Sequence, residues 1–210
     1  MLPRARVLAG VVGVLGLVAI APVRSVRADV LTISGRVDMG LNHGKGLGGG
    51  AKDKAFAATA PLPMFGVQVN VEALFVDVWL GHHQFANGSR IATWSEVGVG
   101  LDMEINSGQG AVRGPFFYLG GGLTFGVGTG QQVELPLDNS EISDKGFAAV
   151  AKLGGGLHLS RLIDVGIEVP MSLGYYFKSG AGIAANDKDT HYTQAALSGL
   201  VFVRARYGLK

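Results

Sequence analysis

The sequence predicts an all-β protein, an eight-stranded antiparallel transmembrane β-barrel of the up-and-down meander type that follows a cleaved signal peptide. Apolar residues alternate with small or polar ones along almost the whole chain, which is the period of a strand with one apolar face. This pattern comes after an N-terminal export signal, in a chain without cysteine. Beyond the signal, no stretch offers the ~18 uninterrupted apolar residues that a membrane-spanning helix needs.

The N-terminal segment, residues 1–28, has the features of a secretory signal peptide. Two arginines lie among its first six residues, an apolar run follows, and Val26-Arg27-Ala28 provides a cleavage site before Asp29. A retained inner-membrane anchor is the alternative, but glycines interrupt the apolar run, which ends short of the ~20 residues of a spanning helix. We therefore expect export through the Sec pathway and a single outer-membrane barrel domain over residues 29–210.

Composition narrows the function classes. The formal net charge is +2, from 18 basic and 16 acidic residues, so no strong field favours nucleic acid and we expect no nucleic-acid partner. The absence of cysteine excludes disulfides, thiol catalysis and a lipoprotein anchor. We expect no catalytic residues, no metal site and no cofactor, and thus a protein that is not an enzyme.

Four strands are predicted in the first half of the chain. The first runs over residues 31–42, with its apolar residues at odd positions. The second and third lie within 65–85, where the apolar positions change from odd to even near Ala73, and such a change indicates a tight turn. The fourth covers 91–105, and its polar face is strongly acidic.

The second half predicts four more strands, over 116–129, 147–160, 163–178 and 192–209. The 163–178 strand has an apolar residue at every odd position from Val165 to Phe177, and its charged residues lie at even positions. Pro170 cannot donate a ladder hydrogen bond, so we expect a β-bulge there. Five aromatic residues near strand ends are expected to form an interfacial belt, namely Phe65, Phe117, Tyr175, Phe177 and Tyr207.

The connections alternate between short and long. The longest cover 43–61, 130–145 and 179–191, and an even strand count would place all three outside the cell with both termini in the periplasm. The first carries Lys45, Lys52 and Lys54, whereas the 130–145 loop is acidic, with Glu134, Asp138, Glu141 and Asp144. Either loop could bind a host surface, a phage or another envelope protein.

This pattern resembles the eight-stranded outer-membrane proteins of Gram-negative bacteria, the OmpA-barrel and OmpX type. The resemblance covers residues 29–210 and rests on the strand pattern. It implies the bacterial outer membrane as location, with outer-membrane lipid, lipopolysaccharide and the barrel-assembly machinery as partners. The chain departs from the family at its end, because a terminal aromatic residue is common there and this chain continues past Tyr207 to Gly208-Leu209-Lys210.

The charged residues predicted to face the lumen are of both signs. An eight-stranded barrel has room inside for its own side chains or one small ligand, so we expect these charges to pair and plug the lumen. A pair between Glu168 and Arg204 is expected from strand position, with Arg36 near the same level. The predicted charge network comprises Arg36, Asp38, Asp77, Glu96, Asp102, Lys152, Glu168, Arg204 and Arg206, and Glu104, Asp164 and Lys178 have the same inward parity.

We therefore expect a non-enzymatic barrel that acts through exposed loops or in envelope integrity. A narrow conduit for small polar or lipophilic solutes is the first alternative, favoured if the inner glycines leave a gap. A secreted lipocalin-like barrel, with apolar residues inward around a ligand, is the second. The inner glycines are Gly98, Gly100, Gly120, Gly122, Gly154 and Gly156.

Two groups of polar residues invite comparison with known chemistry. His158, Ser160 and Glu168 are similar to the His-x-Ser pair and glutamate of outer-membrane lipid A deacylases, but inward parity at the periplasmic end does not suit a lipid substrate, and strand-end polar residues are the simpler interpretation. His82 and His83 are adjacent and would point to opposite faces of a strand, so they cannot chelate one ion together.

Overall fold

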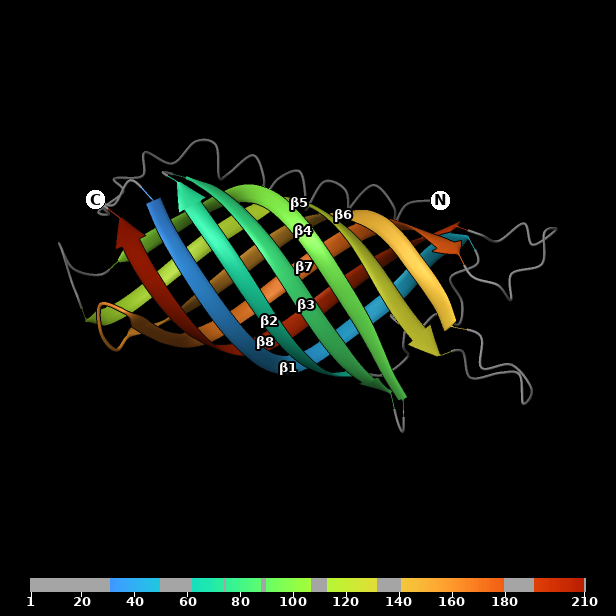
Figure 1. Cartoon of the computed structure of the whole chain (residues 1–210), viewed down its shortest axis with the longest axis horizontal. Coiled ribbons are helices and arrows are strands. Elements are labelled where there is room, and N and C mark those ends of the chain that lie inside the picture. The colour runs from blue at the N-terminus through green and yellow to red at the C-terminus, as the bar shows by residue number, and fades with distance from the viewer. Residues whose placement is uncertain are drawn as a thin grey trace, which may run out of the picture.

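Eight strands form one closed antiparallel barrel in the described part of the chain (Figure 1). The computed structural model describes residues 31–49, 62–73, 75–87, 90–106, 113–131, 141–179 and 191–209. The strands are β1 (Leu31–Gly49), β2 (Leu62–Ala73), β3 (Val76–Asn87), β4 (Arg90–Asn106), β5 (Gly114–Gln131), β6 (Glu141–His158), β7 (Ile163–Ser179) and β8 (His191–Leu209). The predicted fold class is thereby confirmed for the barrel.

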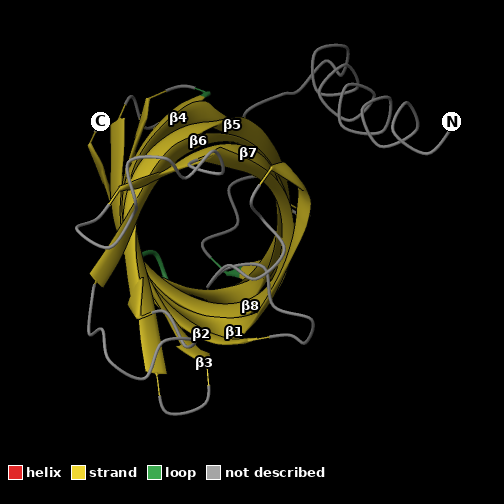
Figure 2. Cartoon of the chain, turned by 90° about the vertical axis from the view of Figure 1, so that its right-hand side faces the viewer, coloured by secondary structure: helices red, strands yellow, loops and turns green. Residues whose placement is uncertain are grey.

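Each strand pairs with its sequence neighbours, and β8 returns to pair with β1 from Leu31↔Leu209 to Gly49↔Tyr192. The strands thus form the ring seen along the barrel in Figure 2. The β1–β8 ladder contains a register shift between Gly46 and Gly48. No helix long and apolar enough to cross a membrane occurs among the described residues.

The two ends of the barrel differ. One end, here called the turn end, contains Leu31 and Leu209 and the connections 73–76, 106–114 and 158–163. At this end β2 and β3 are joined through the pair Ala73↔Val76. The other end, here called the loop end, carries the connections 49–62, 87–90, 131–141 and 179–191. The predicted placement of the three long connections at one end is confirmed.

Apolar side chains cover the outside of the barrel, and polar and charged side chains together with aromatic ones fill its inside. Ile33, Val37 and Met39 of β1 are exposed, whereas Ser34, Arg36 and Asp38 between them are buried. The same alternation holds on the other strands, and Phe117 and Leu123 reach 63% exposure. This continuous apolar outer face suits hydrocarbon chains. The lipocalin-like alternative, which requires the reverse orientation, is therefore wrong.

The strand bounds and one local detail differ from expectation. β1 extends to Gly49 instead of ending at residue 42, and β6 begins at Glu141 instead of residue 147, so strand pairing continues into segments predicted as loops. The expected bulge at Pro170 is wrong. The β7–β8 register is unchanged between Glu168↔Leu200 and Met171↔Leu197, and the missing N–H interrupts the ladder without adding a residue.

Parts of the predictions fall outside the described residues. These are the signal peptide 1–28, the loop residues Lys52, Lys54, Glu134 and Asp138, and the final residue of the chain. Of the predicted aromatic belt, Phe65, Phe117, Phe177 and Tyr207 are exposed on the outer face. Tyr175 is half-buried and packs against Phe177, with ring centroids 5.0 Å apart.

Val99→Arg tests whether the outer face contacts lipid. Val99 lies midway along β4 and is 51% exposed, so arginine there should lower the free energy of unfolding by about 2–4 kcal/mol in phospholipid vesicles. Gln84→Arg, also outward but near the loop end, is the control and should cost about 0–1 kcal/mol. Urea titration of the vesicle-folded protein measures both, and equal effects at the two positions would contradict a lipid-facing belt.

Candidate functional site: the barrel lumen

The lumen is filled in layers from the turn end towards the loop end. A cluster of charged side chains lies at the turn end, followed by a layer of aromatic rings, a second charged cluster at the centre, and a cavity in the loop-end half. All nine residues of the predicted lumen network have inward positions in this arrangement. The side chain of Lys178, also predicted to face inward, is outside the described residues.

The turn-end cluster is built from Glu72, Glu104, His158, Asp164, Arg204 and Arg206. Asp164 is fully buried and lies 2.9 Å from Arg204 Nη2, measured from Oδ2. Glu104 Oε2 accepts a hydrogen bond of 3.1 Å from the same guanidinium, and Arg206 Nη2 lies 3.3 Å from Asp164 Oδ1. The cluster therefore joins β4, β6, β7 and β8 through the lumen. Glu72 of β2 is at its edge, with Oε1 4.0 Å from Arg204 Nη1.

His158 belongs to this cluster. Its Nδ1 lies 2.7 Å from Asp164 Oδ1, and its Nε2 lies 3.4 Å from Glu104 Oε1. The imidazole also stacks on Phe116, with ring centroids 4.4 Å apart. These contacts hold the ring between two carboxylates and an aromatic face.

The next layer consists of three buried aromatic residues, Phe116, Tyr118 and Phe202. Phe116 and Phe202 are 0% and 1% exposed, which places them among the most deeply buried side chains. The aromatic layer has a guanidinium group on each side. Arg36 Cζ is 4.7 Å from the ring centroid of Phe202, and Arg204 Cζ is 5.5 Å from the ring centroid of Phe116. The layer thus separates the two charged clusters with apolar surface while making cation–π contacts to both.

At the barrel centre, Arg36 of β1 and Glu168 of β7 form a bidentate ion pair. Nη1 and Nη2 each donate a hydrogen bond of 2.8 Å to one carboxylate oxygen. Arg36 Nε also donates to Asp38 Oδ2 at 3.1 Å, and the Tyr118 hydroxyl donates to Glu168. Both side chains of the pair are at most 7% exposed, and the pair spans β8, which lies between β7 and β1 in the ring.

A second ion-pair group completes the central cluster. Lys152 Nζ lies 3.0 Å from Asp77 Oδ2 and 2.8 Å from Asp102 Oδ2. Asn70 Nδ2 donates to both oxygens of Asp77 at 2.9 Å. These contacts connect β2, β3, β4 and β6, opposite the wall from which Arg36 and Glu168 project. The central cluster is Arg36, Asp38, Asn70, Asp77, Asp102, Lys152 and Glu168.

The expected Glu168–Arg204 pair is replaced by other partners. Leu200, not Arg204, lies opposite Glu168, and Arg204 lies opposite Asp164. Counting from strand ends treats the ends as level, whereas closing a barrel requires a stagger between neighbouring strands. Glu168 therefore pairs with Arg36, and Arg204 pairs with Asp164 and Glu104.

Above the central cluster, the lumen contains a cavity of about 140 Å³. Its floor includes Arg36, Lys152 and Glu168, and its wall is largely aromatic and apolar. The aromatic and large apolar residues of the wall include Trp79, Trp94, Phe85, Met64, Tyr176 and Leu200. Gln68, Asn42 and Ser198 add polar groups to the lining. The charged clusters thus lie at the turn end and the centre of the barrel, and the cavity lies in the loop-end half.

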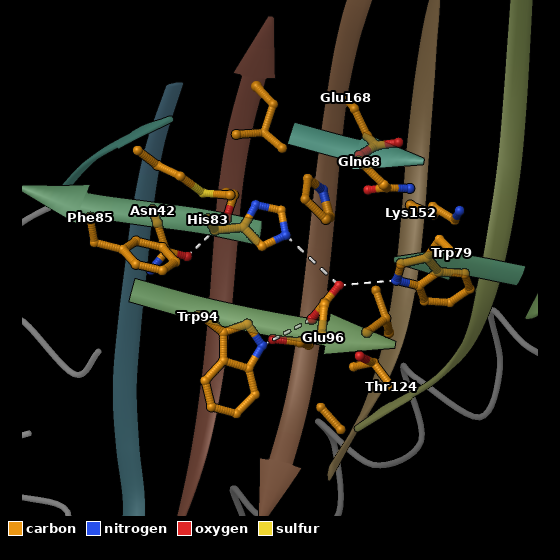
Figure 3. A pocket seen from close by; sticks show the side chains of 18 of the residues that line it. Asn42, Gln68, Trp79, His83, Phe85, Trp94, Glu96, Thr124, Lys152 and Glu168 are labelled. Carbon is orange, nitrogen blue, oxygen red and sulfur yellow. Dashed lines mark hydrogen bonds and ion pairs between the residues drawn. The ribbon is translucent and has the colours of Figure 1, made fainter. Parts of the chain in front are cut away.

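Glu96 is the carboxylate in the cavity wall (Figure 3). Trp79 Nε1–H donates to its Oε1 and Trp94 Nε1–H donates to its Oε2, each at 3.0 Å. His83 Nε2 lies 3.8 Å from Oε1. The two tryptophans of the chain therefore both hold this carboxylate by neutral hydrogen bonds.

Inner glycines allow the large rings to lie against the barrel wall. A Cβ atom on Gly98 would lie 2.1 Å from the Trp79 ring, and one on Gly154 would lie 2.4 Å from the Tyr118 ring. The space above these glycines, predicted to favour a continuous gap, is instead occupied by side chains from the neighbouring strand. Sequence reasoning missed these aromatic residues, although their inward parity opposite glycine is a signal that could have found them.

The residues compared with lipid A deacylases, and the two adjacent histidines, do not form a common site in the structure. Ser160 Oγ accepts hydrogen bonds from the backbone N–H groups of Leu162 and Ile163, at 3.1 and 3.0 Å, while His158 and Glu168 belong to different clusters. His82 points outward with its Nδ1 2.8 Å from Ser95 Oγ, and His83 points inward, as predicted. No group of three or more potential metal ligands occurs among the residues that the structure describes.

Comparison with known proteins shows the fold. No protein-family model matches the chain, and no curated protein sequence matches it. The structure is similar to Neisserial surface protein A, with a TM-score of 0.52 and 10% identity over 83% of this chain and 97% of the other. The N-terminal barrel domain of Pseudomonas aeruginosa OprF (TM-score 0.47, 8% identity, 83% and 97% covered) and Yersinia pestis Ail (0.43, 10%, 84% and 98%) are also similar. The chain thus has the fold of an eight-stranded outer-membrane barrel.

Glu168→Ala is expected to destabilise the barrel strongly. Removing the carboxylate leaves the buried Arg36 guanidinium without its bidentate partner, and breaking a buried pair costs about 3–5 kcal/mol. Urea unfolding of the vesicle-folded protein measures the change. Val169→Ala, at the neighbouring position on the outer face, controls for local packing. A loss for Glu168→Ala no larger than that control would show that the pair does not stabilise the barrel.

Gly98→Ala tests the packing of aromatic rings on inner glycines. The added methyl group must displace the Trp79 ring, and overpacking of this kind costs about 1–3 kcal/mol. The tryptophan emission maximum should also shift, since the indole loses its position beside Glu96. Gly35→Ala, where nothing lies within 4 Å of the added Cβ, should leave both quantities nearly unchanged. Equal behaviour of the two variants would contradict the close packing.

Proposed function

We propose that this protein is a non-enzymatic β-barrel of the Gram-negative outer membrane whose lumen is closed by its own side chains, and that it acts through its exposed loops or in envelope integrity. The carrying observation is the succession of the turn-end cluster, the aromatic layer and the central cluster. Asp164, Phe116 and Phe202 in these layers are at most 1% exposed. The apolar outer face supports the membrane setting.

The proposed orientation places the turn end in the periplasm and the loop end outside the cell. An even number of strands, with the start of β1 and the end of β8 at the turn end, supports it. It includes removal of residues 1–28 by the Sec pathway and insertion by the barrel-assembly machinery. Lys45 of β1 and Lys145 of β6 are exposed near the loop end, where their ammonium groups suit the phosphates of lipopolysaccharide and outer-membrane lipid.

A narrow conduit is the second candidate function. The observation that favours it is the cavity of about 140 Å³ in the loop-end half, which leaves only the centre and the turn end to be opened. In this case a rearrangement of the central cluster would be required for a solute to pass. The carboxylates that outnumber the basic groups there, such as Asp77 and Asp102 around Lys152, would make the conduit select cations.

Single-channel recording in a planar bilayer tests the closed lumen. We expect the inserted protein to give no stepwise current, and Glu168→Ala to give stepwise currents because Arg36 loses the carboxylate that fixes its guanidinium in the central cluster. Val169→Ala should behave like the unmodified protein. Reproducible stepwise openings of the unmodified protein, absent from the empty bilayer, would contradict the proposal and favour the conduit.

A further inference from the structure

The ion-paired side chains inside the barrel carry an excess of negative charge. In the described network, leaving histidines aside, four cationic side chains face eight carboxylates. The cations are Arg36, Lys152, Arg204 and Arg206, and the carboxylates are Asp38, Glu72, Asp77, Glu96, Asp102, Glu104, Asp164 and Glu168. A lumen of one sign, enclosed by a low-dielectric wall, attracts a mobile ion of the other sign.

Glu96 is one of these carboxylates, and it lines the cavity. Its partners in the described structure are the indole N–H groups of Trp79 and Trp94 and the imidazole of His83. No lysine or arginine nitrogen of the described residues forms an ion pair with it. The indole hydrogen bonds hold the carboxylate in place on the cavity wall, and among the described residues its basic partner is the His83 imidazole.

Two neighbouring polar atoms are also unpartnered. His83 is 8% exposed, and its Nδ1 has no hydrogen-bond partner; the same is true of Oδ1 of Asp38, which is 1% exposed. Both atoms face the space above Gly66, because a Cβ atom there would lie 2.6 Å from Nδ1 and 2.3 Å from Oδ1. His83 lines the cavity, and its buried, unpartnered Nδ1 is a polar atom to which a bound polar group can supply a hydrogen-bond partner.

The rest of the wall suits the hydrocarbon part of such a ligand. Trp79, Trp94, Phe85 and Tyr176 present aromatic surface beside Glu96. The lumen already contains a cation in contact with one of these rings, since Lys152 Nζ lies 4.7 Å from the Trp79 centroid. The volume of about 140 Å³ is close to that of an apolar cavity that accepts benzene, about 150 Å³.

From these observations we propose that the loop-end cavity binds a small organic ammonium ion, with its charge at Glu96 and its hydrocarbon part against the tryptophan and phenylalanine rings. The ammonium places a positive charge beside Glu96, with which no lysine or arginine of the described residues forms an ion pair. The aromatic faces add cation–π attraction. This inference concerns the cavity above the central cluster and does not depend on whether the lumen conducts.

Tryptophan fluorescence provides a direct test, because both tryptophans of the chain line this cavity. The purified protein in detergent micelles is titrated with benzylammonium chloride at constant ionic strength. Benzyl alcohol and sodium benzoate serve as neutral and anionic probes of similar size. We expect a saturable change with benzylammonium, and binding at least about tenfold weaker for the other two probes, a difference of about 1.4 kcal/mol. Absence of a saturable change, or equal binding of benzyl alcohol, would overturn the proposal.

Glu96→Gln identifies the group responsible. The amide preserves the size of the side chain and removes its charge, so benzylammonium should bind at least about tenfold more weakly. Glu104→Gln removes one carboxylate charge from the turn-end cluster and should change binding less than twofold. Circular dichroism and heat-modifiable migration on gels verify that each variant is folded. Equal weakening in both variants would overturn Glu96 as the site and indicate a general field effect. The probe comparison on the unmodified protein stands even if a variant does not fold.

Discussion

The bidentate pair between Arg36 and Glu168 is the interaction on which the interior depends. It connects β1 to β7 on the luminal side of β8, and its two members also hold Asp38 and the Tyr118 hydroxyl. Because the outer face of the barrel is apolar, these charges have no solvent-facing alternative. The pairs therefore form among the inward positions that the strand register brings together, and the aromatic layer and the cavity take the space that remains on either side.

The sequence predicted which face each strand turns inward, because the two-residue alternation survives through every strand. It did not predict which inward residues meet. Glu168 and Arg204 were expected to pair from their distance to the strand ends, but the stagger of the barrel places Asp164 opposite Arg204. A side-chain period of two fixes a face, whereas the partner depends on the register of all eight strands around the closed ring.

The cavity was the least predictable part of the site. Inner glycines such as Gly98 indicated missing side-chain volume, but where that volume lies depends on the rings that lean over them. Trp79 lies flat over Gly98 and donates to Glu96, so the glycine contributes to the position of a polar contact on the next strand. Pro170 was also mispredicted. Its missing N–H interrupts the β7–β8 hydrogen-bond ladder, but the register is the same before and after it, so no bulge forms.

The closing ladder between β1 and β8 joins segments from opposite ends of the chain, with Leu31 beside Leu209. Until β8 is available, a partly made chain has two unpaired strand edges, which hydrocarbon cannot satisfy by hydrogen bonding. Contacts of such long sequence separation also form slowly. The topology therefore implies that the barrel completes its folding only after synthesis of the whole chain. Intermediates in the aqueous compartment would expose the future lipid-facing surface and would need protection from aggregation.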